Sequence, residues 1–186
     1  MTPINTLLPG ILDSGISGNL VTTNFISIAT ATVDSSGAST ITFSSIPQTY
    51  THLQLRYVSK IGSSSDNVII KFNGDTASNY SWHYLMGNGS SASAGSGASQ
   101  GYILNDVLLT QFNGSIVDIL DYTNTAKAKT TRTLMGVDMN GSGNVWLSSG
   151  AWYNNTAGVY PAISSITLTT NATFQEYSQF ALYGVK

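Results

Sequence analysis

Residues 50–59 read YTHLQLRYVS, and their side chains alternate between polar and apolar along the chain. The two kinds of side chain fall on opposite sides of an extended backbone: Leu53, Leu55 and Tyr57 on one, and His52, Gln54 and Arg56 on the other. A period of two residues is typical of a β-strand that buries one face. The stretch DNVIIKF at 66–72 alternates in the same way. Both stretches therefore predict strands of a half-buried antiparallel sheet.

Similar short runs continue on both sides of these two stretches. They lie at about 26–33, 38–45, 80–86, 115–122, 130–138, 144–152, 163–169 and 176–185. Asn-Gly pairs at 73–74, 88–89, 113–114 and 140–141 fall between runs, and this dipeptide favours hairpin turns. Helix formers are scarce, since the chain has a single glutamate and 18 glycines. The pattern predicts an all-β domain over 26–186, an antiparallel two-sheet β-sandwich of the jelly-roll kind.

The first 25 residues form a separate, apolar segment. It contains apolar side chains at helix-like spacing, namely Leu7, Leu8, Ile11, Leu12 and Ile16. Pro9, Gly10, Gly15 and Gly18 interrupt any helix longer than one or two turns. Two interpretations remain, an extended N-terminal arm that binds another chain and a strap that crosses the sandwich. We favour the arm, because chain termini are loose unless something holds them.

A second unusual segment, GNGSSASAGSGAS at 87–99, has no side chain larger than asparagine. Its composition predicts a flexible surface loop. The alternative is that small side chains allow close packing against a neighbouring subunit.

Composition excludes several classes of function. The chain has no cysteine, which rules out disulfides, thiolate metal sites and a cysteine nucleophile. Its net charge of −2 offers no basic surface for nucleic acid or for anionic lipid. No apolar run approaches the 18 or so residues of a membrane span. We therefore expect neither nucleic acid nor membrane as a partner.

Candidate catalytic groups do not form a recognisable set. Only His52 and His83 could serve as imidazole bases, and no GxSxG motif singles out one serine. Asp118 and Asp121 lie an odd number of residues apart, which places them on opposite faces of a strand. The segment DMNGSGN at 138–144 resembles the start of a calcium loop but lacks its final acid, so a hairpin tip is the better interpretation. We expect no enzymatic activity, no cofactor and no metal.

Aromatic residues are concentrated in two segments, NYSWHYLM at 79–86 and VWLSSGAWYNNT at 145–156. Trp82, Tyr84, Trp152 and Tyr153 are the candidate interface or glycan-binding residues of these segments. Tryptophan and tyrosine beside asparagine can form a platform for sugar rings. The other interpretations are a subunit interface and, favoured by the shared strand face of Trp82 and Tyr84, simple core packing.

Several segments together resemble a known group of proteins. They are SSIPQTYTHLQLRYVSK at 44–60, KFNGDTASNYSWHYLMGNGSSASAGS at 71–96, DILDYTNTAKAKTTRTLMGVD at 118–138 and FALYGVK at 180–186. The chain over about 38–186 is similar to β-sandwich virion proteins of tailed bacteriophages. Members of such lineages serve as head decoration (cement) proteins or as parts of tails and tail fibres.

The resemblance implies a structural role and carries no catalytic residue. The expected function is that of a capsid decoration protein, which binds the major capsid protein or another virion protein and stabilises the head shell. Few charges, many aromatic residues and the lack of a catalytic set predict a homo-oligomer. The resemblance implies that it is a homotrimer, at the phage head surface rather than the tail. The alternative is a tail-fibre or adhesin module that binds a host surface glycan.

Overall fold

The computed structural model describes residues 24–62, 66–108 and 110–186, with side chains not described over 105–108. The described residues form twelve β-strands and no helix, and so none of them could cross a membrane as a helix. The strands are β1 (Phe25–Thr32), β2 (Ala38–Phe43), β3 (His52–Ser59), β4 (Asp66–Phe72), β5 (Tyr80–Gly87), β6 (Ala92–Gln100), β7 (Ile103–Leu108), β8 (Asn113–Leu120), β9 (Lys129–Asp138), β10 (Gly143–Trp152), β11 (Ile166–Phe174) and β12 (Gln179–Val185).

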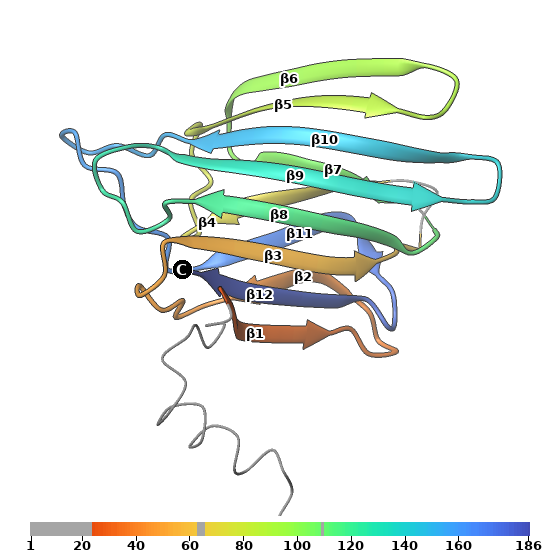
Figure 1. Cartoon of the computed structure of the whole chain (residues 1–186), viewed down its shortest axis with the longest axis horizontal. Coiled ribbons are helices and arrows are strands. Elements are labelled where there is room, and N and C mark those ends of the chain that lie inside the picture. Colours follow the sequence, from red (N-terminus) through yellow and green to blue (C-terminus); the bar gives the residue numbers. More distant parts are fainter. Residues whose placement is uncertain (1–23, 63–65, 109) are drawn as a thin grey trace, which may run out of the picture.

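The strands build two antiparallel sheets that pack face to face. The large sheet has eight strands in the order β1-β12-β3-β8-β9-β10-β5-β6, and the small sheet has four in the order β2-β11-β4-β7. Figure 1 shows the large sheet in front and the small sheet behind its β1-to-β10 part. The predicted all-β sandwich is confirmed.

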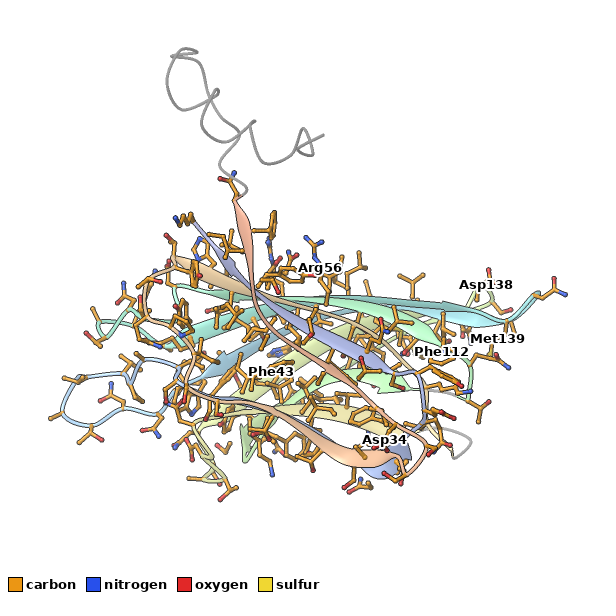
Figure 2. All side chains as sticks on the ribbon, turned by 90° about the horizontal axis from the view of Figure 1, so that it is seen from below. Asp34, Phe43, Arg56, Phe112, Asp138 and Met139 are labelled. Carbon is orange, nitrogen blue, oxygen red and sulfur yellow. The ribbon has the colours of Figure 1, made fainter. Side chains whose placement is uncertain are left out.

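The core lies between the two sheets and is formed by the inward-facing residues, which alternate with outward-facing ones along each strand. Its fully buried members include Leu53 and Leu55 of β3, Ile70 and Phe72 of β4, and Phe180 of β12. Figure 2 views the layers from the side and shows Phe43 between them. The alternation that predicted β3 and β4 thus arises because one face of each strand enters this core.

All ten predicted runs overlap strands, but two strands were not predicted. Residues 92–100 form β6, so the flexible loop predicted for 87–99 is wrong except at its hairpin turn. Gly95 pairs with Tyr84 and Gly97 with Trp82 across β5 and β6. A Cβ at Gly95 would come within 2.6 Å of the Tyr84 ring, and one at Gly97 within 2.5 Å of the Trp82 ring. The strand is rich in small residues because two aromatic rings lie flat across it.

The four Asn-Gly pairs have three different roles. Residues 88–89 and 140–141 turn the hairpins β5-β6 and β9-β10, as predicted. Residues 73–74 also turn, with φ of 52° and 68°, but they lead from the small sheet to the large one. Residues 113–114 are the first residues of β8, so the turn predicted there is wrong.

The two ends of the described chain meet at one edge of the large sheet. Phe25 pairs with Val185, and the Lys186 amide donates a hydrogen bond to the Asn24 carbonyl at 3.1 Å. Phe25, placed in the predicted arm, is already the first residue of β1. The arm residues Leu7, Leu8, Ile11, Leu12 and Ile16 lie outside the described residues.

Candidate interaction surface

A row of apolar side chains crosses the outer face of the large sheet. The register places Ile116 of β8, Leu134 of β9, Leu147 of β10 and Leu85 of β5 side by side. Their exposed fractions are 44%, 54%, 52% and 54%. Among the strands drawn in Figure 1, none lies in front of this face. These four side chains, called the apolar row below, contribute nothing to the core and remain in contact with water.

A second row runs parallel to the first and consists largely of glycine. Val58 of β3, Gly114 of β8, Gly136 of β9 and Val145 of β10 are neighbours in register. Val58 and Val145 are more than half exposed. A Cβ built at Gly114 or Gly136 would meet no atom within 4 Å. The two glycines therefore form the floor of a hollow between the two valines.

This hollow is part of a groove of about 820 Å³ that crosses six strands, from β1 to β10. Thr30 and Gln179 line its end near β1, and Val145 lines its end near β10. Ile116 and Leu134 of the apolar row form one side. An extended groove that crosses strands and is lined mainly by apolar groups suits a chain segment better than a compact polar ligand.

Polar side chains border the apolar row on the side away from the glycine floor. Gln54 Nε2 donates to Asp118 Oδ1 at 2.8 Å, and Arg132 donates to Asp118 Oδ2 at 3.0 Å. These residues occupy the same register line across β3, β8 and β9. An apolar centre with a polar rim is the usual anatomy of a protein-binding surface.

Arg56 stands at the groove without a charged partner among the described residues. Its guanidinium lies 4.8 Å from the centre of the Phe25 ring and 5.1 Å from that of Tyr183. Its Nε donates to Gln54 Oε1 at 2.5 Å. The ion pairs of the described chain do not include it. Figure 2 shows Arg56 on the outer side of the large sheet.

The predicted aromatic residues do not form one surface. Trp82 and Tyr84 are half-buried: Trp82 stacks on Tyr84 with ring centres 6.1 Å apart, and Tyr84 stacks on Trp146 with ring centres 4.0 Å apart. Trp152 is only 1% exposed and belongs to the core, which corrects its prediction as a contact residue. Tyr153 is 53% exposed and is the one exposed member of the predicted set.

Trp152 is held in the core by a carboxylate. Its Nε1 donates to Asp75 Oδ2 at 2.7 Å, and Asn79, Asn154 and the Ala77 amide donate to the same carboxylate at 2.8–3.0 Å. Partial burial acts to raise the pKa of Asp75, but the four hydrogen bonds outweigh it and hold the pKa below 3.8. This carboxylate fastens the turn before β5 to the end of β10.

Other titratable groups with shifted pKa values have structural partners too. Burial raises the pKa of Tyr80 to about 12, and its hydroxyl bonds to the backbone at Phe72 and at Asp75. Asp66 accepts hydrogen bonds from Thr170 Oγ1 at 2.6 Å and from the Ala172 amide at 2.7 Å, which helps to lower its pKa. Each of these groups connects loops or strands, and none of them lines the groove described above.

A serine and a histidine do come together, but without an acid. Ser149 of β10 and His83 of β5 are direct partners in register on the outer face. Asp118 lies on the same register line on β8, three strand spacings or about 14 Å from β5, and is bound to Arg132. His52, the first residue of β3, accepts at Nδ1 a hydrogen bond from the Asp121 amide. Within the described residues these groups do not form a triad.

The described residues contain no group of three or more histidine, aspartate or glutamate side chains placed to hold a metal. The calcium-like segment 138–144 forms the tip of the β9-β10 hairpin, as predicted. Its turn is closed by a hydrogen bond from the Met139 amide to the Ser142 carbonyl at 2.7 Å.

Comparison with protein-family models, with curated proteins and with solved structures gave no match to this chain. The expected resemblance to phage virion proteins therefore has no support from these comparisons.

Sequence reasoning missed the apolar row, although a signal was present. Ile116 is followed by Val117, Leu134 by Met135, and Leu147 follows Trp146. In each pair an apolar residue occupies the position where alternation calls for a polar one. Such pairs indicate strands with two apolar faces, of which only one can enter a two-layer core.

Proposed function

We propose that the chain is a non-enzymatic structural protein of a bacteriophage virion, a capsid decoration protein that binds the head shell. The observation that carries this proposal is the uncovered apolar row beside the glycine-floored groove. Contiguous apolar surface rimmed by polar side chains marks sites of interaction between macromolecules. The titratable groups described above serve the fold, which supports a role in binding over a role in catalysis.

The connectivity of the strands supports the jelly-roll part of the proposal. Eight strands alternate between two four-stranded layers, β1-β12-β3-β8 and β2-β11-β4-β7. The remaining strands β5, β6, β9 and β10 extend the first layer at one side. Two interlocked four-stranded layers of this kind suit a double Greek key. The extension enlarges the outer face of the large sheet, where the apolar row lies.

The proposed partner is the major capsid protein or another virion protein, and the proposed assembly is a homotrimer at the head surface. Few charges and an uncovered sheet face favour a permanent contact. Closed symmetry is the usual result when identical subunits meet through one repeated contact. The order of three comes from the family resemblance and the threefold positions that a capsid offers.

The alternative, a tail-fibre or adhesin module that binds glycan, has weaker support. Trp82 stacks on Tyr84, Tyr84 stacks on Trp146, and both Trp82 and Tyr84 lie against glycines of β6, so their faces are largely occupied. Tyr153 is exposed but stands without a second exposed ring of the predicted set.

Electron microscopy of virions that carry a tag at the C-terminus of this chain tests the proposal. Lys186 lies at the surface beside Asn24, so a tag there leaves the groove free. Labels over the head shell are the expected result. Labels along the tail would favour the adhesin alternative, and virions without label would remove the virion assignment.

A further inference from the structure

The groove on the large sheet and the first 23 residues share one chemical character. The groove is lined by apolar side chains and a glycine floor, and no described segment covers it. Residues 1–23 contain the densest apolar cluster outside the described structure, Leu7, Leu8, Ile11 and Leu12. The chain enters the described structure at Asn24, on the edge strand of the same sheet.

We propose that residues 7–13 of the same chain lie in this groove in the free protein. Leu8, Ile11 and Leu12 would cover the floor at Gly114 and Gly136, and Asp13 would pair with Arg56. The groove would thus be the binding site of the N-terminal segment in the free protein.

The length of the segment fits this path. Leu134 lies four strand spacings across the sheet from β1 and six residues along it from Asn24, a distance of about 28 Å. The twelve residues back from Asn24 to Leu12 span up to about 40 Å when extended. The slack allows the chain to reverse direction over the edge strand, and Gly15 and Gly18 permit the turn.

Charge gives a second, independent match. Arg56 is the one charged residue in the lining of the groove, and no carboxylate pairs with it among the described residues. Asp13 is the one charged side chain in residues 1–23 and follows Leu12 directly. A single pair of opposite charges would fix the register of the segment in an otherwise apolar contact.

The size of the patch favours a segment over a second copy of the sheet. Four strand spacings and two rows of side chains give about 300 Å² of apolar surface. A stable dimer buries about 800 Å² on each partner, so two such patches packed face to face would be too small. A tethered segment instead binds at an effective concentration in the millimolar range, which favours the chain's own copy over a neighbour's.

The docking of residues 7–13 in the groove does not depend on the proposed function. The role of this docking in capsid binding does rest on that function. On a capsid, release of the segment would provide the arm for the partner and uncover the apolar row together. Because burial of a few leucines and the ordering of the chain nearly cancel, the docked state would exchange readily for a better partner.

Cysteine pairs in the full-length chain test the docking directly, since the natural chain has no cysteine. The test variant carries Leu12→Cys and Leu134→Cys. The control carries Leu12→Cys and Thr42→Cys, because Thr42 is exposed on the outer face of the small sheet. Oxidised glutathione is the oxidant, and non-reducing gels with mass spectrometry separate intramolecular from intermolecular products.

We expect the test variant to form its intramolecular disulfide at least about tenfold faster than the control, as local concentration dictates. Equal rates in the two variants, or dimers as the main product, would overturn the proposal. A charge reversal gives a second readout on the same pair. Asp13→Arg should slow disulfide formation, and adding Arg56→Asp should restore it; no change in either step would contradict the Asp13–Arg56 contact.

This result is separable from that of the virion experiment. Disulfide formation is measured on the isolated protein, so it reports docking whether or not the chain belongs to a virion. Labelled virions in turn report the location of the chain whether or not the groove holds the segment.

Discussion

Leu134 of β9 and Leu147 of β10 are direct partners in the antiparallel register, and each side chain is more than half exposed to water. Their strand neighbours Met135 and Trp146 are also partners and lie on the opposite, buried face at 1% and 3% exposure. The two strands are therefore apolar on both faces. The inner pair stabilises the sandwich, while the outer pair is free to contact a segment or a partner.

The double variant Leu134→Ser/Leu147→Ser should leave the stability of the sandwich nearly unchanged and reduce the binding of a segment or a partner to this face. Surface substitutions that remove no core contact change the free energy of unfolding by about 0.5 kcal/mol or less. Denaturant unfolding measures stability, and dye binding with light scattering measures exposed apolar surface and self-association. The matched control is Met135→Ser, which should cost about 2–5 kcal/mol because it removes a buried side chain. A large loss of stability in the outer variant would mean that Leu134 and Leu147 contribute to the packing of the sandwich itself.

Glycine substitutions separate the groove from the core. Gly114→Val and Gly136→Val should fold at least as well as the natural chain, because open space surrounds both positions and valine suits a strand better than glycine. The valine side chains should fill the groove and weaken the binding of a segment or a partner there.

Gly150→Ala is the control for these two substitutions. A Cβ at Gly150 would lie 2.5 Å from Ile103 and 2.7 Å from Thr131, inside the core. Thermal unfolding should show a loss of about 1–3 kcal/mol for this variant alone. Loss of stability at Gly114 or Gly136 of the same size would show that the groove is not open space.

Much of the fold follows from the sequence because buried and exposed positions alternate along the strands, and in β3 and β4 the buried ones are mostly apolar. The residues of β3, β4 and β9 illustrate this, since their buried and exposed positions alternate almost without exception. The same reasoning does not predict β6. Its glycines leave room for the rings of Trp82 and Tyr84 on the neighbouring strand β5, whereas its composition alone indicates a loop.

The sheet order and the candidate surface depend on contacts that sequence alternation does not contain. The row from Ile116 to Leu85 joins four strands, and the partners β5 and β10 are far apart in the chain. Asn113-Gly114 was predicted to turn because local dipeptide preference favours it, yet Asn113 is buried in the sheet at 1% exposure. Tertiary packing overrode the local signal there.

Asp75→Asn should destabilise the sandwich by about 1–3 kcal/mol. The carboxylate accepts hydrogen bonds from Trp152, Asn79, Asn154 and the Ala77 amide, and an amide cannot accept all four. The fluorescence of the tryptophans provides a local readout beside denaturant unfolding. Asp34→Asn is the control, since Asp34 is exposed and bonds only within its own turn. Equal effects of the two substitutions would contradict the proposed role of Asp75.

Stability should fall as the pH drops below about 4 and as it rises above about 10. The pKa of Asp75 is lower in the folded chain than its usual 3.8, so its contribution is complete above 3.8 and is lost as the pH falls through the lowered value. The pKa of Tyr80 rises from 10.0 to about 12, so its contribution is complete below pH 10 and is lost between pH 10 and pH 12.

Thermal melting across the pH range checks both limits. The variant Asp75→Asn should make the acid limb shallower, although Asp34, Asp66 and Asp121, whose pKa values are also lowered, still titrate there. Tyr80→Phe should make the alkaline limb shallower at the cost of the hydroxyl bonds to Phe72 and Asp75. Unchanged limbs in both variants would assign the pH dependence to other groups.

Deletion of residues 1–20 should leave the sandwich folded and sharply weaken its binding to virions. The deletion removes Leu7, Leu8, Ile11, Leu12 and Ile16, and it leaves all the described residues of the core between the sheets in place. Ordering the whole arm of about 20 residues costs about 1–2 kcal/mol per residue, far more in total than ordering residues 7–13 alone, so apolar burial cannot hold the whole arm on a partner. Backbone hydrogen bonds to a partner, such as an added strand at a sheet edge, must provide the rest.

Circular dichroism and light scattering verify the fold and the oligomeric state of the truncated chain, and co-sedimentation with heads that lack the natural protein measures binding. The full-length variant Leu8→Ser/Leu12→Ser is the matched control, since it keeps the length of the arm and removes its apolar contacts. Both variants should bind more weakly than the natural chain. If the truncated chain decorates heads as well as the full-length protein, the segment acts only as a strap over its own groove, and the sheet face alone must make the contact.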